Sequence, residues 1–132
     1  MSKTIGVLTI HIGGAMRPYE KVFSLAVAKT AEKLGINLVF YSGGFYEMQT
    51  GFERLRNFVY DFVKYDKPDG LLIISSLLGN FIELEVMGSF FARFHGIPAV
   101  SAGVKIPGIP SIVVDNAAGM ETVTRHLTET HG

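Results

Sequence analysis

The sequence predicts an α/β domain in which five parallel strands form one sheet with helices on both faces. Short apolar runs of strand length alternate with longer runs that have helical apolar spacing, and glycine or proline marks most boundaries. Strands that alternate with helices imply parallel pairing through right-handed crossovers. We expect the strand order 2-1-3-4-5 and a single domain over residues 1–132, since a chain of this length fits one hydrophobic core.

The first strand and the first helix have the clearest signals. Residues 5–12 are mostly apolar and β-branched, which is typical of a strand buried on both faces, and Gly13 and Gly14 end the run. Pro18 suits the start of a helix, where its missing N–H would be unpaired anyway. Apolar residues then recur at helical spacing as far as Leu34, and Gly35 supplies the stop.

The middle of the chain repeats this pattern twice. Residues 36–41 are predicted to form the second strand, followed by a glycine loop and a helix over residues 51–64. After a Pro-Asp-Gly turn signal, the third strand is predicted over residues 71–78 and a helix over residues 82–94. Both helices have phenylalanine-rich faces, which we expect to lie in the core.

The last third of the chain adds two strands and one helix. Residues 97–102 are predicted to form the fourth strand. Residues 105–110 contain two prolines that exclude regular structure, because proline lacks a donor and restricts the residue before it. A short fifth strand over residues 111–114 leads into a helix over residues 117–130.

Composition excludes several classes of function. The chain has no cysteine, which excludes disulfides, thiolate catalysis and cysteine zinc sites. Its 12 basic residues balance its 12 acidic ones, so we expect no direct contact with nucleic acid. No apolar stretch approaches the roughly 20 residues of a membrane span. We therefore expect no membrane contact and a cytoplasmic location. We also expect no cofactor and no metal, since the spacing of His126 and His131 does not put them on one helical face.

The candidate ligand residues lie where the predicted strands end. Ligands of open parallel sheets bind outside the carboxyl ends of the strands. Neither familiar glycine-rich phosphate motif occurs, and no cysteine or serine motif pairs with His11, so we expect no catalytic residues. The candidate set is His11, Gly13, Ser75, Ser76, Gly103, Asp115 and Asn116.

Several of these candidates also have a purely structural interpretation. His11 has the chemistry of a base or a ligand contact, but a structural or solvent-facing histidine fits the same pattern. Ser75 and Ser76 suit capping and turn hydrogen bonds as well as ligand hydroxyls. Asp115 and Asn116 precede a predicted helix, where an N-cap is expected.

Several segments resemble the LacI-type sensing domains of the periplasmic-binding-protein-like class. Residues 67–76 (KPDGLLIISS) and 96–100 (GIPAV) are similar to two of that family's strands. Residues 110–116 (PSIVVDN), with residues 119–120 and 125–127, resemble the stretch that leads across the family's hinge. The pieces keep the family's order and cover almost the whole chain.

A closer likeness is to LacI-like sensors fused to diguanylate cyclase or histidine kinase outputs. Its signs include residues 41–44 (YSGG), 51–53 (GFE) and 78–80 (LGN). The resemblance implies one lobe of a type I periplasmic-binding-protein-like fold, itself Rossmann/flavodoxin-like, that closes with a second lobe over a small ligand. It implies a sugar-like or nucleoside-like ligand, with the candidate residues as hydrogen-bonding groups and Asp115 as the main acceptor from hydroxyls.

Two departures from that family alter the expectation. The helix-turn-helix of the repressors is absent, so the resemblance does not imply a repressor. The sequence also stops where the family begins its second lobe, so we expect at most half of a cleft. Without that lobe, Met120, Val123 and Leu127 would lack cover, and exposed apolar patches favour association. We expect a homodimer, for which exchange of the C-terminal helix is one route.

Two other functions stay open at this point. A flavodoxin-like nucleotide- or flavin-binding protein would need a phosphate cradle, which the motifs do not provide. A dimerisation module without a ligand would share the predicted fold and the predicted dimer.

Overall fold

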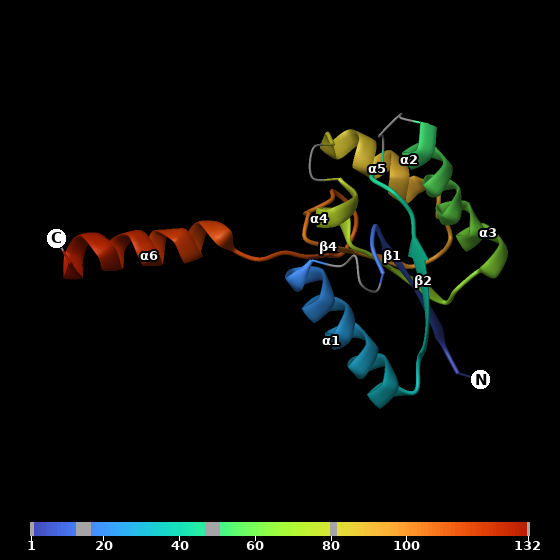
Figure 1. The fold of residues 1–132 in the computed structure, drawn as a ribbon, viewed down its shortest axis with the longest axis horizontal. Helices are drawn as coiled ribbons and strands as arrows, with labels where there is room; N and C mark the ends of the chain where they lie inside the picture. Colours follow the sequence, from blue (N-terminus) through green and yellow to red (C-terminus); the bar gives the residue numbers. More distant parts are fainter. Residues whose placement is uncertain (1, 13–16, 47–50, 80–81, 132) are drawn as a thin grey trace.

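The five predicted strands form one parallel sheet. The computed structural model describes residues 2–12, 17–46, 51–79 and 82–131. The strand order is β2-β1-β3-β4-β5 with every pair parallel, which confirms the predicted fold class and strand order (Figure 1). The strands are β1 (Thr4–Thr9), β2 (Asn37–Ser42), β3 (Gly70–Ile73), β4 (Ala99–Ala102) and β5 (Ser111–Ile112).

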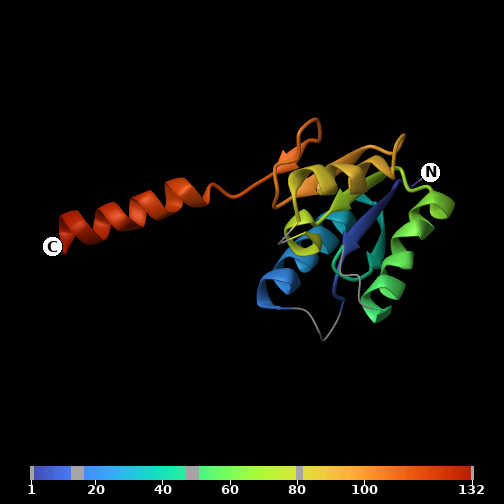
Figure 2. The ribbon, with the colours of Figure 1, turned by 90° about the horizontal axis from the view of Figure 1, so that it is seen from above.

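Helices cover the two faces of the sheet unequally. One face carries α1 (Pro18–Leu34), which begins at the predicted proline and ends at Gly35 in the left-handed conformation. The opposite face carries α2 (Gly51–Arg56), the 3-10 segment η2 (Asn57–Phe62), α3 (Val63–Asp66) and α5 (Leu84–Ala92). The last helix, α6 (Asn116–Thr130), stands away from the body in both views (Figures 1 and 2).

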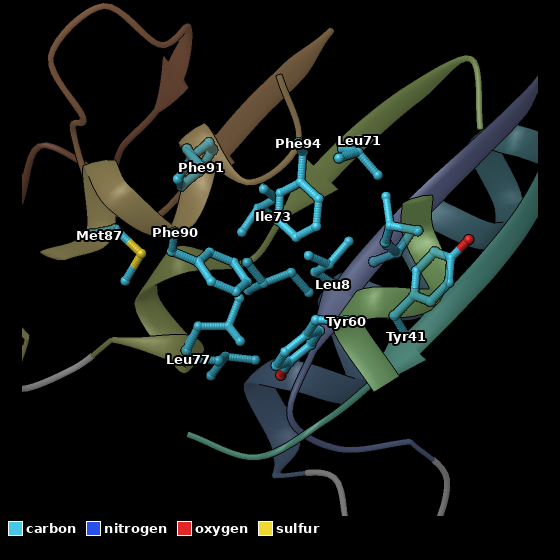
Figure 3. Packing of buried hydrophobic residues seen from close by; sticks show 14 of the residues in the cluster. Leu8, Tyr41, Tyr60, Leu71, Ile73, Leu77, Met87, Phe90, Phe91 and Phe94 are labelled. Carbon is cyan, nitrogen blue, oxygen red and sulfur yellow. The ribbon is translucent and has the colours of Figure 1, made fainter. Parts of the chain in front are cut away.

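The hydrophobic core lies on the face that carries η2 and α5 (Figure 3). Phe90 is fully buried, and its ring centroid lies 5.5 Å from that of Tyr60 and 5.3 Å from that of Phe94. Leu8 of β1 and Ile73 of β3 belong to the same buried cluster. The phenylalanines of α5 are thus core residues, as predicted. The same prediction was wrong for the helix over residues 51–64, because Phe52, Phe58 and Phe62 are 73%, 57% and 57% exposed and that segment buries Tyr60 and Val63 instead.

The prediction of a third strand over residues 71–78 was wrong in its second half. β3 ends at Ile73, and α4 (Ser75–Leu78) follows as a single helical turn. The carbonyl of Ile74 accepts hydrogen bonds from the N–H groups of Leu77 and Leu78, which closes that turn. A short apolar run that is buried in either conformation has no periodicity to separate strand from helix.

Other predicted boundaries shift for local reasons. The predicted helix over residues 51–64 is divided by η2, whose i→i+3 winding is tighter than that of its neighbours. β1 stops at Thr9 and not at residue 12, and β5 stops at Ile112, so Val113 and Val114 are exposed and lie outside the sheet.

Among the described residues, no helix is long and apolar enough to cross a membrane.

Candidate functional site

The carboxyl ends of β1, β3 and β4 bring several predicted residues to one edge of the sheet. His11 follows β1, Ser76 lies in α4 just after β3, and Gly103 follows β4. Gly13 lies outside the described residues. No group of three or more histidine, aspartate or glutamate side chains within the described ranges is arranged to hold a metal ion.

His11 is paired with a buried carboxylate that the sequence analysis did not select. Its Nδ1 atom lies 3.2 Å from Oε2 of Glu20, whose side chain is 2% exposed. The same Oε2 accepts a hydrogen bond from the backbone N–H of Arg17 at 3.1 Å, which caps the start of α1. An acidic residue three positions after a helix start is an ordinary capping signal. Only the burial of Glu20 distinguishes it from a surface cap.

The other carboxylate oxygen of Glu20, Oε1, is buried and has no hydrogen-bond partner within the described part of the chain. Three hydroxyls share this condition: Thr9 at the end of β1, Ser24 two turns into α1, and Ser76 in α4. Buried polar groups are nearly always paired, and each exception calls for an explanation such as water or a ligand. Thr9, Glu20 (through His11) and Ser76 belong to segments at the carboxyl ends of β1 and β3, so we take this edge of the sheet as the candidate polar site.

Ser75 occupies a different place from Ser76. It is fully buried, and its hydroxyl donates to the carbonyl of Ala102 at 2.9 Å and accepts from the N–H of Val104 at 3.0 Å. It also lies 2.7 Å from the hydroxyl of Ser101. Ser75 therefore fastens the end of β3 to the loop after β4 and fixes the position of neighbouring residues.

Gly103 lies directly against Ser76. Its φ of +104° is a conformation that side chains rarely adopt. A Cβ atom at this position would lie 2.3 Å from Cβ and 2.4 Å from Oγ of Ser76. The backbone of the β4 loop thus closes over Ser76, which only glycine allows.

Asp115 and Asn116 lie at the start of α6, away from the other candidates. Oδ1 of Asp115 accepts a hydrogen bond from the N–H of Ala118 at 3.0 Å, which confirms the N-cap interpretation for this residue. No residue of α6 is buried, and the helix projects from the body (Figure 2). The structure does not bring these two residues to His11, Ser76 and Gly103.

The opposite side of the β1 terminus is held by side chains from α2 and η2. Arg56 donates to the carbonyl of Ile10 at 2.8 Å, and the hydroxyl of Tyr60 donates to the carbonyls of Thr9 and Gly44 at 3.1 and 3.0 Å. Burial raises the pKa of the Tyr60 hydroxyl well above its usual 10.0, so it stays protonated and can donate. These contacts hold the chain between Thr9 and His11 in place.

Comparisons with known proteins establish the fold. No protein-family model and no curated protein matches the chain. A structure of the dimeric Lac repressor with an 11-residue C-terminal deletion is similar, with a TM-score of 0.71 and 18% sequence identity over 96% of this chain. The chain spans 42% of that repressor's length. The α/β fold expected from the sequence is therefore confirmed, and that repressor structure shares it over almost the whole of this chain.

Proposed function

We propose that this chain is one lobe of a ligand-sensing regulatory domain and binds a small polar molecule at the carboxyl ends of β1, β3 and β4. The observation that carries the proposal is Oε1 of Glu20, a buried carboxylate oxygen without a described partner at the edge where parallel sheets bind ligands. The orphaned hydroxyl of Ser76 at the same edge supports it. The Lac repressor likeness adds a fold in keeping with this role.

The residues favour a ligand that carries hydroxyl or amine groups. A carboxylate accepts such donors, and charge-assisted hydrogen bonds of this kind are about twice as strong as neutral ones. Because Nδ1 of His11 faces Glu20, Nε2 is the ring atom that we assign to the ligand. Ser76 adds a group that donates and accepts, and Gly103 leaves the backbone close to it. A sugar-like or nucleoside-like molecule has suitable groups.

The proposal is for binding and not for catalysis. His11 and Glu20 form a pair that would suit a general base, but no hydroxyl in the described segments is hydrogen-bonded to His11. A nucleophile within reach of its base is the first requirement of covalent catalysis.

The proposed sensing mechanism needs a second lobe. A single lobe buries much less of a ligand than the 70–90% typical of closed sites. Closure of two lobes would favour the liganded state and pass occupancy to an output domain, such as a diguanylate cyclase or a histidine kinase, as a population shift. We propose a cytoplasmic location for this arrangement, and Asp115 and Asn116 would join the site only if the start of α6 approached it.

The exchange Glu20→Gln tests the binding site, because it keeps the size of the side chain and removes its charge. We expect binding of D-ribose, D-glucose or adenosine, followed by NMR titration of the whole chain, to weaken by about tenfold, since hydrogen bonds to charged groups are worth about 1.5–3 kcal/mol. Glu85→Gln, at an exposed position on α5, is the control and should leave the affinity unchanged. Equal affinities for the two variants would contradict the assignment of Glu20.

A further inference from the structure

Glu20 is a buried carboxylate whose charge no lysine or arginine balances in the described part of the chain. Its side chain is 2% exposed, and the ion pairs that lysines and arginines of this part form all involve other carboxylates. Arg17 and Lys21, the basic residues nearest to it in the sequence, are exposed near the start of α1. Taking a carboxylate out of water without a cation is costly. This charge in a ligand site therefore favours a ligand of opposite charge.

His11 contacts Glu20 without removing this need. Its Nδ1 atom lies 3.2 Å from Oε2, so the contact engages one carboxylate oxygen and leaves the buried Oε1 without a described partner. An imidazole balances the charge of a carboxylate only when both ring nitrogens carry a proton. In the neutral tautomer that we assign, Nδ1–H donates to Oε2 and Nε2 is an acceptor. Both side chains then offer acceptors to a ligand.

The orphaned hydroxyls at the same edge add further polar atoms. Oγ1 of Thr9 and Oγ of Ser76 are buried and have no hydrogen-bond partner within the described ranges. Hydroxyls can accept or donate, whereas the carboxylate of Glu20 only accepts. An alkylammonium group has three N–H donors and no acceptor, and a sugar hydroxyl has a single donor. An ammonium group thus suits the site both in its charge and in its number of donors.

Arg56, which also reaches the end of β1, does not supply the missing charge. It donates to the carbonyl of Ile10 at 2.8 Å and forms an ion pair with Glu53 at 3.1 Å. It belongs to α2, on the face of the sheet opposite α1. A metal ion is a poor substitute, because no group of three or more histidine, aspartate or glutamate side chains among the described residues could hold one.

We propose that the ligand is an amine-bearing polyol, such as an amino sugar, whose ammonium group binds Oε1 of Glu20 while its hydroxyls bind Ser76 and Nε2 of His11. This inference rests on the proposed function, since it names the class of ligand for the same site. Glu20 then determines specificity, and neutral sugars of the same shape bind more weakly.

Matched pairs of probes test the role of the charge. D-glucosamine carries an ammonium group in place of one hydroxyl of D-glucose, and serinol differs from glycerol in the same way. In NMR titrations of the whole chain at neutral pH, the amine of at least one pair should bind about tenfold more tightly than its neutral partner, because hydrogen bonds to charged groups are about twice as strong as neutral ones. N-acetyl-D-glucosamine, whose nitrogen is uncharged, should lose this advantage.

The exchange Glu20→Gln assigns the preference to one side chain. The amide oxygen of glutamine can still accept from the N–H of Arg17, but the variant should bind the two members of each pair about equally. Glu32→Gln, at an exposed position on the same helix, is the control and should keep the wild-type preference. Thermal unfolding checks that both variants fold. The wild-type comparison with N-acetyl-D-glucosamine does not depend on either variant.

The outcomes separate this inference from the proposed function. Equal binding within both pairs, with shifts at His11, Ser76 and Gly103, would overturn the amine and leave a site for neutral ligands. A preference for the amine that survives in Glu20→Gln would overturn the role given to Glu20. Absence of binding by every probe would overturn the proposed function and this inference with it.

Discussion

The hydroxyl oxygen of Ser75 lies 2.7 Å from that of Ser101, and both residues are fully buried. Ser101 also donates to the carbonyl of Val104, and Ser75 accepts from the N–H of the same residue. This pair joins the end of β3 to the loop after β4, which is the loop that brings Gly103 against Ser76. The geometry of the candidate site therefore rests on two serines that do not need to contact a ligand.

Replacing Ser101 by alanine should destabilise the domain by about 1–3 kcal/mol, because buried hydrogen-bonding groups lose their partner. Urea unfolding followed by circular dichroism measures this loss. Ser89→Ala is the control, since the hydroxyl of Ser89 is exposed and donates to the carbonyl of Glu85 within the same helix. Its effect should stay within about 0.5 kcal/mol. Similar losses in the two variants would contradict the role given to the buried pair.

Comparing alanine substitutions at two glycines with positive φ distinguishes the cost of backbone strain from the cost of a steric clash. At Gly103, φ is +104° and an added Cβ atom would lie 2.3 Å from Cβ of Ser76. At Gly108, φ is +75° and an added Cβ atom would have nothing within 4 Å. We expect Gly103→Ala to be the more destabilising by about 1–3 kcal/mol, the usual cost of overpacking. Thermal unfolding of both variants measures the difference. The double variant Gly103→Ala/Ser76→Gly should recover part of the lost stability, because it removes the side chain that the new Cβ atom would meet. No recovery would contradict the inferred contact between positions 76 and 103.

The hydroxyl of Tyr60 should leave a signature at high pH. Burial raises its pKa above the ordinary 10.0, so the folded state holds a proton that the unfolded chain releases near that pH. The associated stability is therefore complete below about pH 10 and is lost as the pH rises further. In Tyr60→Phe the decline of the unfolding free energy above pH 10 should be shallower than in the wild type. Parallel declines would contradict the inferred pKa.

Asp115 is expected to stabilise α6 by capping its N-terminus. Asp115→Ala should remove the bond to the N–H of Ala118, at a cost of about 1 kcal/mol, and lower the helical signal in circular dichroism. Asn accepts the same bond, so Asp115→Asn should keep the helix. Loss of helix in both variants would show that charge, and not the hydrogen bond, stabilises this terminus.

The strand order and the first helix follow from the sequence because their signals are local and strong. Pro18 and Gly35 bound α1 by their own backbone preferences, and the alternation of strands and helices allows few topologies. The end of β3 did not follow from the sequence, since residues 74–78 form a short, mostly buried run with no periodicity that separates strand from helix. In this segment, tertiary hydrogen bonds from Ser75 to Ala102 and Val104 favour the helical turn over a longer strand.

The position of the candidate site was predictable from the sequence, but not all of its residues were. His11, Ser76 and Gly103 were expected at the strand ends because parallel strands share one carboxyl edge. The sequence did not predict Glu20 as a site residue, because a glutamate in the first turn of a helix is an ordinary capping residue. Its burial arises from the way in which α1 packs on the sheet, which no local pattern encodes.

The chemical-shift map of the backbone amides during titration with D-ribose, D-glucose and adenosine tests the central claim most directly. Binding should be weak, with a Kd of about 1–10 mM, since one lobe buries little of the ligand. The account predicts that at least one probe shifts the amides of His11, Ser76 and Gly103 together, at the carboxyl ends of β1, β3 and β4. No shift with any of the probes, or shifts confined to residues away from these strand ends, would contradict it.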